Sequence, residues 1–269
     1  MATMQQIELP FTRRRKSPDR GGSVPRGALR WSATIAVAAA ATVAVTMAAP
    51  GAAWAAPRDP FDPATPTVFV AQGNPTQLSI LVQSAGGATF EAEGGPAPFR
   101  YNAIAYNTAD NYLYGIRFAG PEGNHLVRIG QEGEATDLGE DVGLPIPPLH
   151  DGYNQATFGE GAYADTLFVR NSVELGVIDL VDVAAQTSTR LTLPADIPNL
   201  SDIVFKDGYL WGVYSTIDAT DATIYRIDPA TGAAETFPSG LGLPGADFGA
   251  RWIYGNGNLG ISANQTGQV

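Results

Sequence analysis

The sequence predicts an all-β fold, a β-propeller-like array of four-stranded blades. A pattern of four short apolar runs separated by turns returns every 47 to 52 residues, counted from Tyr101 to Tyr153, Ser201 and Phe248. Such a period is typical of propeller blades. The chain also has 31 glycines and 20 prolines, which indicates many turns. No window after residue 56 carries the i, i+3, i+4, i+7 pattern of an amphipathic helix.

The expected strands are short apolar runs bounded by turn residues. The first, divergent blade is expected at 68–72, 77–82 and 88–93, and the second at 101–107, 112–117, 125–129 and 135–138. The third is expected at 156–159, 166–170, 174–179 and 187–193. The fourth and clearest copy occupies 202–214, 223–232 and 234–237, and a fifth begins with 251–254 and 258–262.

Two turns in the fourth copy have a specific physical reason. Asp207-Gly208 stands between two apolar runs, where a glycine accepts the positive φ of a tight hairpin. Asp228-Pro-Ala-Thr-Gly232 reverses the chain with a proline near its start and a glycine at its end. Gly115, Gly212 and Gly260 follow at matching places inside strands, and we expect them to permit close approach to a neighbouring blade or to the propeller axis.

The first 55 residues have the features of an export signal. A basic stretch beginning at Arg13 precedes an uncharged run rich in Ala and Val from Ala33 to Ala49, and Ala53-Trp54-Ala55 forms an A-x-A cleavage motif. We expect cleavage between Ala55 and Ala56. The uncharged stretch 32–56 is also long enough for a membrane anchor, which is the alternative interpretation.

Domain boundaries follow from this leader. Residues 1–55 are predicted to be a signal peptide, residues 56–66, with four prolines, a linker, and residues 67–269 the β-propeller-like domain. Because 258–269 aligns with the middle of the preceding copy, the sequence predicts an incomplete array of about four and a half blades, truncated at its C-terminus. A naturally short, open array is the alternative.

The net charge limits the classes of molecule that the folded domain can bind, and the cysteine content bears on how its core is stabilised. Seven of the 16 basic and two of the 27 acidic residues lie in 1–55, so the remainder has 9 basic and 25 acidic residues and a formal charge of −16. Such a domain repels nucleic acid and anionic lipid, so we expect no nucleic-acid partner and membrane contact only through an uncleaved leader. The chain has no cysteine, so the core forms without disulfides.

The stretch from Tyr101 to Ile116, YNAIAYNTADNYLYGI, resembles the opening of a propeller-like domain of unknown function found in exported and surface proteins of actinobacteria. The resemblance covers about residues 68–269. It implies a propeller fold and an exported, actinobacterial context. That family has no established catalytic residues, so the resemblance leaves the activity open.

Residues that could form a site are few. His125 and His150 have no partner at metal-ligand spacing, and His125 is expected at the surface. His150 and Asp151 lie in a connection between blades, where propellers often place binding residues, and are the candidates for a binding loop. No nucleophile elbow, Walker loop or calcium loop is present, and we expect no cofactor and no metal.

Two further groups of side chains suggest alternative functions, catalysis by carboxylates and sugar binding by aromatic rings. The carboxylates Asp110, Asp151, Asp202 and Asp247 could meet around a channel and act as an acid/base pair, although solvated loops are the simpler interpretation. Aromatic side chains could form a sugar-stacking platform but are more often core between blades: Tyr101, Tyr106, Tyr112, Tyr114, Tyr209 and Trp211.

The sequence therefore predicts an extracellular or cell-surface propeller-like module with a non-catalytic binding or spacer role in a larger surface protein. Its expected partner is an extracellular ligand or another domain of the same polypeptide. The alternative is an extracellular hydrolase or lyase that acts on polysaccharide.

Overall fold

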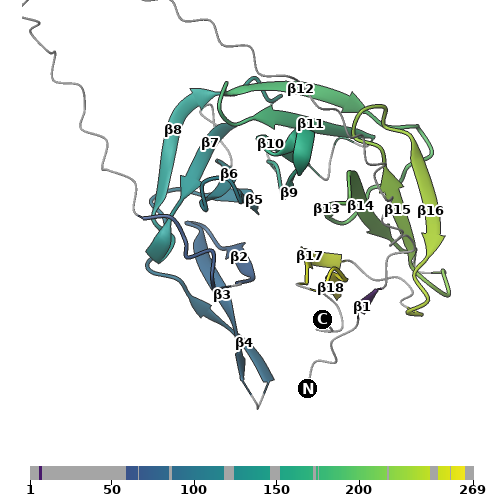
Figure 1. Ribbon diagram of the computed structural model, residues 1–269, viewed down its shortest axis with the longest axis horizontal. Coiled ribbons are helices and arrows are strands. Elements are labelled where there is room, and N and C mark those ends of the chain that lie inside the picture. Colours follow the sequence, from purple (N-terminus) through teal and green to yellow (C-terminus); the bar gives the residue numbers. More distant parts are fainter. Residues whose placement is uncertain are drawn as a thin grey trace, which may run out of the picture. The chain divides into compact units, whose positions relative to one another are not determined.

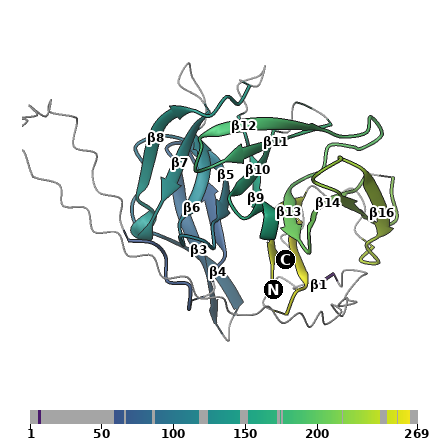
Figure 2. The same ribbon diagram turned by 45° about the horizontal axis from the view of Figure 1, so that its top comes forward.

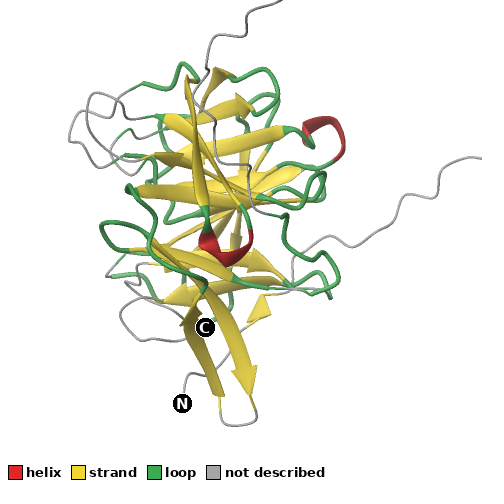
Figure 3. Ribbon diagram, turned by 90° about the vertical axis from the view of Figure 1, so that its left-hand side faces the viewer, coloured by secondary structure: helices red, strands yellow, loops and turns green. Residues whose placement is uncertain are grey.

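The computed structural model describes residues 6–7, 59–65, 67–84, 87–117, 124–145, 152–171, 174, 176–216, 218–242, 248–254 and 256–263. The chain divides into two units, residues 1–9 with 57–269 and residues 10–56, and all described residues belong to the first. In its described ranges this unit is all-β apart from two helical turns of three residues each, η1 (Gln131–Gly133) and η2 (Gly161–Tyr163). Figure 3 shows them as the red segments among yellow strands.

The described strands form five antiparallel sheets arranged as a β-propeller. The first sheet contains β2 (Phe69–Gln72), β3 (Gln77–Ser84) and β4 (Gly87–Ala92). The second contains β5 (Tyr101–Tyr106), β6 (Leu113–Arg117), β7 (His125–Ile129) and β8 (Ala135–Asp141). The third contains β9 (Gln155–Phe158), β10 (Thr166–Arg170), β11 (Val177–Asp182) and β12 (Thr187–Thr192).

The fourth sheet contains β13 (Ile203–Lys206), β14 (Tyr209–Tyr214), β15 (Thr223–Ile227) and β16 (Ala234–Pro238). The fifth contains β17 (Phe248–Ile253), β18 (Leu259–Ala263) and the two-residue strand β1 (Gln6–Ile7), which pairs with β18. No strand was expected at residues 6–7. The sequence-based blades otherwise correspond to these sheets, and the expected runs 125–129 and 166–170 match β7 and β10 residue for residue.

The first strands of successive sheets contact one another, in the order β2, β5, β9, β13 and β17. The later strands of the four-stranded sheets lie progressively farther out, ending at β8, β12 and β16 (Figures 1 and 2). This radial order is that of propeller blades. It places the side chains of the first strands where several sheets meet.

Among the described residues, the apolar core forms four clusters, one at each junction between consecutive sheets. Neighbouring residues of one strand enter different clusters because side chains alternate across a strand. In β10, Leu167 and Val169 pack toward the second sheet and Phe168 toward the fourth. In β14, Leu210 packs toward the third sheet and Trp211 toward the fifth. Burial on both faces explains why these strands are continuously apolar.

The structure confirms the predicted hairpin turn, and it shows a different neighbour from the expected one at Gly212. Asp207 and Gly208 both have positive φ, 53° and 85°, as a tight hairpin requires. Gly212 does permit a close approach, since a Cβ there would lie 2.5 Å from Leu200 Cδ1. However, Leu200 belongs to the segment that leads into the same sheet, so the approach is not to a neighbouring blade. The glycine is needed because Leu200, just before β13, packs against β14, the second strand of the same sheet.

Two other segments differ from the expectation. Part of the predicted linker contacts the fold: the Phe61 N–H donates to the Asn111 carbonyl at 2.9 Å, and the Phe61 and Phe69 rings lie 4.7 Å apart. The strand expected at 174–179 is instead β11 at Val177–Asp182, because Gly176 adopts a positive φ of 71° and ends the preceding turn there.

Candidate functional site

Several predicted site residues lie outside the described part of the chain. These are the cleavage-site residues Ala55 and Ala56, the binding-loop candidates His150 and Asp151, and Asp247. Of the four carboxylates that could meet around a channel, Asp110 and Asp202 are described. The Asp110 carboxylate accepts the Tyr114 hydroxyl at 2.7 Å within the second sheet, whereas Asp202 lies at the start of the fourth. The two carboxylates share no hydrogen-bond partner among the contacts described.

His125, expected at the surface, is half-buried at the start of β7. Its Nδ1 lies 3.0 Å from Asp137 Oδ1, and Arg117 Nη1 donates to the same carboxylate at 2.6 Å. Burial opposes ionisation of Asp137, but hydrogen bonds from the Gly139 N–H, His125 and Arg117 outweigh it and hold the pKa of Asp137 below its usual value. The ion pair of Arg117 with Asp137 and the hydrogen bond to the His125 ring thus connect β6, β7 and β8.

The aromatic residues do not form a platform in the described part of the chain. Tyr101, Tyr114 and Trp211 are buried in the clusters between sheets, as the core interpretation predicted. Tyr209 is exposed, and the Arg226 guanidinium lies 4.6 Å from its ring centroid. A cation–π contact of this kind accounts for the exposed ring without a ligand.

Asp221 shows how the loops use their carboxylates. It accepts backbone N–H groups from Ala222, Gly240 and Gly242 at 2.9, 2.7 and 3.0 Å, so its oxygens bind the protein's own chain. Within the described ranges, no group of three or more His, Asp or Glu side chains is placed to hold a metal ion. The same part of the chain contains no helix of the length and apolarity needed to cross a membrane.

The most unusual group of side chains comes from the first two strands of the third sheet, from the residue that precedes the fourth sheet and from the first strand of the fifth. We call it the inner-strand cluster and define it as Gln155, Arg170, Asp202 and Arg251. Gln155 and Arg170 face each other across β9 and β10, Asp202 directly precedes β13, and Arg251 lies in β17. The sequence-based interpretation identified only Asp202 among these. A charged residue at the end of the apolar run Leu167–Val169 was the available signal for Arg170.

One carbonyl connects the third and fourth sheets at this cluster. Gln155 Nε2 and Arg170 Nη1 both donate to the Leu200 carbonyl, at 2.9 and 2.8 Å. Arg251 Nη2 donates to the Val213 carbonyl at 3.3 Å and so connects the fifth sheet to the fourth. The Asp202 carboxylate accepts the N–H groups of Ile203, at 2.9 Å, and of Arg251. The cluster therefore ties together the inner edges of three sheets.

The charges of the cluster are not balanced. Burial is the largest influence on all three ionisable groups: it raises the pKa of Asp202 to about 7 and lowers the pKa of Arg170 and of Arg251 to about 10. Asp202 and Arg251 are partly exposed to solvent, whereas Arg170 is 1% exposed. Attraction between Asp202 and Arg251 only partly opposes these shifts, and Arg170 and Arg251 repel each other.

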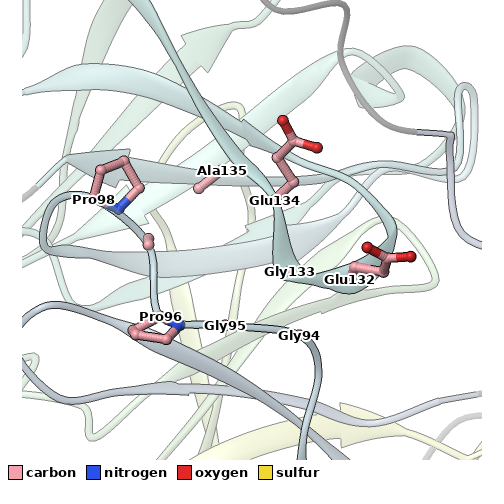
Figure 4. A pocket seen from close by; sticks show the side chains of 9 residues that line it. Gly94, Gly95, Pro96, Pro98, Glu132, Gly133, Glu134 and Ala135 are labelled. Atoms are coloured by element: carbon pink, nitrogen blue, oxygen red, sulfur yellow. The ribbon is translucent and has the colours of Figure 1, made fainter.

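A shallow cavity of about 340 Å³ lies elsewhere, between the segment after β4 and the turn η1. Apart from the carboxylates of Glu132 and Glu134 its walls are glycine, proline and alanine (Figure 4): Gly94, Gly95, Pro96, Ala97, Pro98, Gly133 and Ala135. The two segments approach closely, since a Cβ on Gly94 would overlap the Glu132 carbonyl. Such walls offer few specific contacts, so this cavity is the weaker candidate.

Residues 69–269 match the family described as a repeat of unknown function (DUF6923). The chain belongs to this family. The match begins at the first residue of β2 and covers all the sheets apart from β1, which agrees with the predicted resemblance in extent. No curated protein matches the sequence significantly.

Solved structures with a similar fold are diverse. A nidogen/laminin complex is 16% identical with a TM-score of 0.43, over 66% of this chain and 63% of that one. The hydrazine synthase of Kuenenia stuttgartiensis is 15% identical with a TM-score of 0.43, over 70% and 52%. A protein of unknown function from Bacteroides thetaiotaomicron is 15% identical with a TM-score of 0.45, over 73% and 50%. The chain thus spans half to about two thirds of these proteins.

Proposed function

We propose that this chain is an exported or cell-surface β-propeller module that binds another molecule, or spaces other domains, without catalysis of its own. The observation that carries the binding role is the inner-strand cluster. It contains two guanidinium groups and an amide but only one carboxylate. This set supplies hydrogen-bond donors for recognition, whereas hydrolysis of polysaccharide uses a pair of facing carboxylates.

The export part of the proposal rests on the basic, apolar and A-x-A segments of residues 1–55. It is tested by expressing the full chain with a C-terminal tag in a Gram-positive bacterium and determining its N-terminus by mass spectrometry. A product in the medium or wall fraction that begins at Ala56 supports export. A matched variant, Ala53→Leu with Ala55→Leu, should retain the leader. Wild-type protein that keeps Met1 and stays in the cytosol contradicts the proposal.

The binding part is tested on a panel of cell-wall and extracellular polysaccharides and on wall-associated proteins. Co-sedimentation measures binding, and release of reducing ends or unsaturated sugars measures catalysis in the same tubes. Binding without product supports the proposal. Product release that disappears in Asp202→Asn would contradict it and would favour the alternative, an extracellular hydrolase or lyase.

A further inference from the structure

Arg170 is a buried cation with unsatisfied hydrogen-bonding capacity. One of its N–H groups is used by the Leu200 carbonyl, while Nε and Nη2 are buried and have no acceptor. No carboxylate pairs with Arg170 among the described contacts, and burial alone accounts for its pKa shift. An unpaired buried charge is expensive, so such groups normally have a partner.

Arg251 repeats this condition in the fifth sheet. Its Nη2 reaches the Val213 carbonyl, while Nε and Nη1 are buried without an acceptor. The neighbouring Asp202 carboxylate is bound by backbone N–H groups and influences Arg251 by charge rather than by a side-chain hydrogen bond. The two guanidinium groups are close enough to repel each other, and together they have four buried N–H-bearing nitrogens without an acceptor.

The charge and the donor types define what would complete this cluster. Two arginines against one aspartate leave a local positive excess inside a protein whose formal charge is −11. Guanidinium groups match the oxygen spacing of carboxylate and phosphate and can bind them with two parallel hydrogen bonds. Gln155 Oε1 is also buried without a donor, so a hydroxyl on the ligand would find an acceptor there.

We propose that the inner-strand cluster binds a compact oxyanion, a carboxylate or phosphate group that also carries a hydroxyl, through the free N–H groups of Arg170 and Arg251. This inference rests on the proposed binding function and names its ligand class. The ligand must be small, because the receiving atoms are buried at the inner edges of the sheets. Access is from the side of Asp202 and Arg251, which keep an accessible surface.

The test uses the full chain and two probes, sodium phosphate and sodium glucuronate, against sodium chloride at equal ionic strength. Thermal unfolding and isothermal titration calorimetry are measured for each. A ligand that binds only the folded state raises Tm progressively with concentration above its Kd. We expect a saturable rise with phosphate, with glucuronate or with both, and a single site by calorimetry. A response to one probe alone identifies which oxyanion chemistry the site prefers.

Variants separate the site from general salt effects. Arg170→Met and Gln155→Leu should each weaken binding at least tenfold, whereas Arg190→Met should leave it unchanged because Arg190 is already paired with Asp179 and Glu174. If neither probe stabilises the protein more than chloride does, or if Arg170→Met responds like the wild type, the inference is wrong. Polysaccharide or protein binding that persists in that case would leave the proposed function standing without this ligand class.

Discussion

Replacing Arg170 with methionine should stabilise this protein in a buffer that contains no oxyanion. The arginine side chain is 1% exposed and has two nitrogens without acceptors. Methionine has a similar volume and needs no hydrogen bonds, and buried ionic groups can often be replaced by apolar side chains with no loss or with a gain of stability. The Leu200 carbonyl would keep its bond from Gln155 Nε2 at 2.9 Å, so the substitution leaves no new unsatisfied acceptor there.

The magnitude follows from the lowered pKa. Burial brings the pKa of Arg170 down to about 10. From the ordinary value of 12.5, at about 1.4 kcal/mol per pKa unit, this disfavours the charged side chain by about 3.5 kcal/mol relative to a solvated arginine. Loss of the bond to Leu200, whose donor is charged, offsets about 1.5–3 kcal/mol. The net gain is about 0.5–2 kcal/mol, or roughly 1–8 °C in Tm for a domain of this size.

Thermal and urea unfolding of the full chain, followed by tryptophan fluorescence, measure this change. Arg190→Met is the matched control. Arg190 Nε donates to the buried Asp179 carboxylate at 2.8 Å, and its removal leaves that carboxylate without its charged partner. The control should lose about 1–3 kcal/mol. If Arg170→Met loses stability to the same extent as the control, then Arg170 has a compensating partner and is not the unpaired buried charge described above.

Three further predictions concern pH and packing. Because the pKa of Asp202 is raised to about 7, its contribution to stability is present at low pH and is lost as the pH rises. In urea titrations between pH 5 and 6.5, the free energy of unfolding of the wild type should therefore fall by about 1.4 kcal/mol per pH unit relative to that of Asp202→Asn. Parallel pH profiles of the two proteins would contradict this prediction. The pKa of Asp137 is lowered, so its effect has the opposite direction: its contribution to stability is lost as the pH falls below about 4. Asp137→Asn should therefore reduce the decrease of Tm at acid pH. A decrease as steep as in the wild type would refute this prediction. Gly212→Ala should cost about 1–3 kcal/mol because its Cβ would meet Leu200, whereas Gly95→Ala, with no atom within 4 Å, should be nearly neutral; equal Tm values for the two variants would refute the packing argument.

Local signals predicted the strands and turns well because each of them depends on adjacent residues. The pair Asp207-Gly208 is sufficient for a hairpin, and the continuous apolar run of β14 indicates burial on both faces. The position of β11 was less predictable, since the strand-like composition of 174–179 did not show that the chain turns at Gly176. Strand β1 pairs with a strand more than 250 residues away, and no local pattern reports such a pairing.

The inner-strand cluster could not be predicted for the same physical reason. Arg170, Asp202 and Arg251 belong to three sheets and come together only when the sheets pack. The sequence showed one charge at the end of an apolar strand, Arg170, and another at the start of an expected strand, Arg251, but not that the two lie close enough to repel each other. It also could not distinguish Asp202, desolvated among the inner strands, from Asp110, which accepts hydrogen bonds within its own sheet.

Leu200 has a consequence for how this chain can vary. Its carbonyl accepts hydrogen bonds from side chains of β9 and β10, and its side chain fills the space beside Gly212. Both the main chain and the side chain of this residue, which lies outside the strands, are therefore fixed. Surface connections ordinarily tolerate insertions and deletions. A single added residue between β12 and β13 would displace both contacts together. We therefore expect this connection to keep a constant length across related repeats while other connections between blades lengthen and shorten freely.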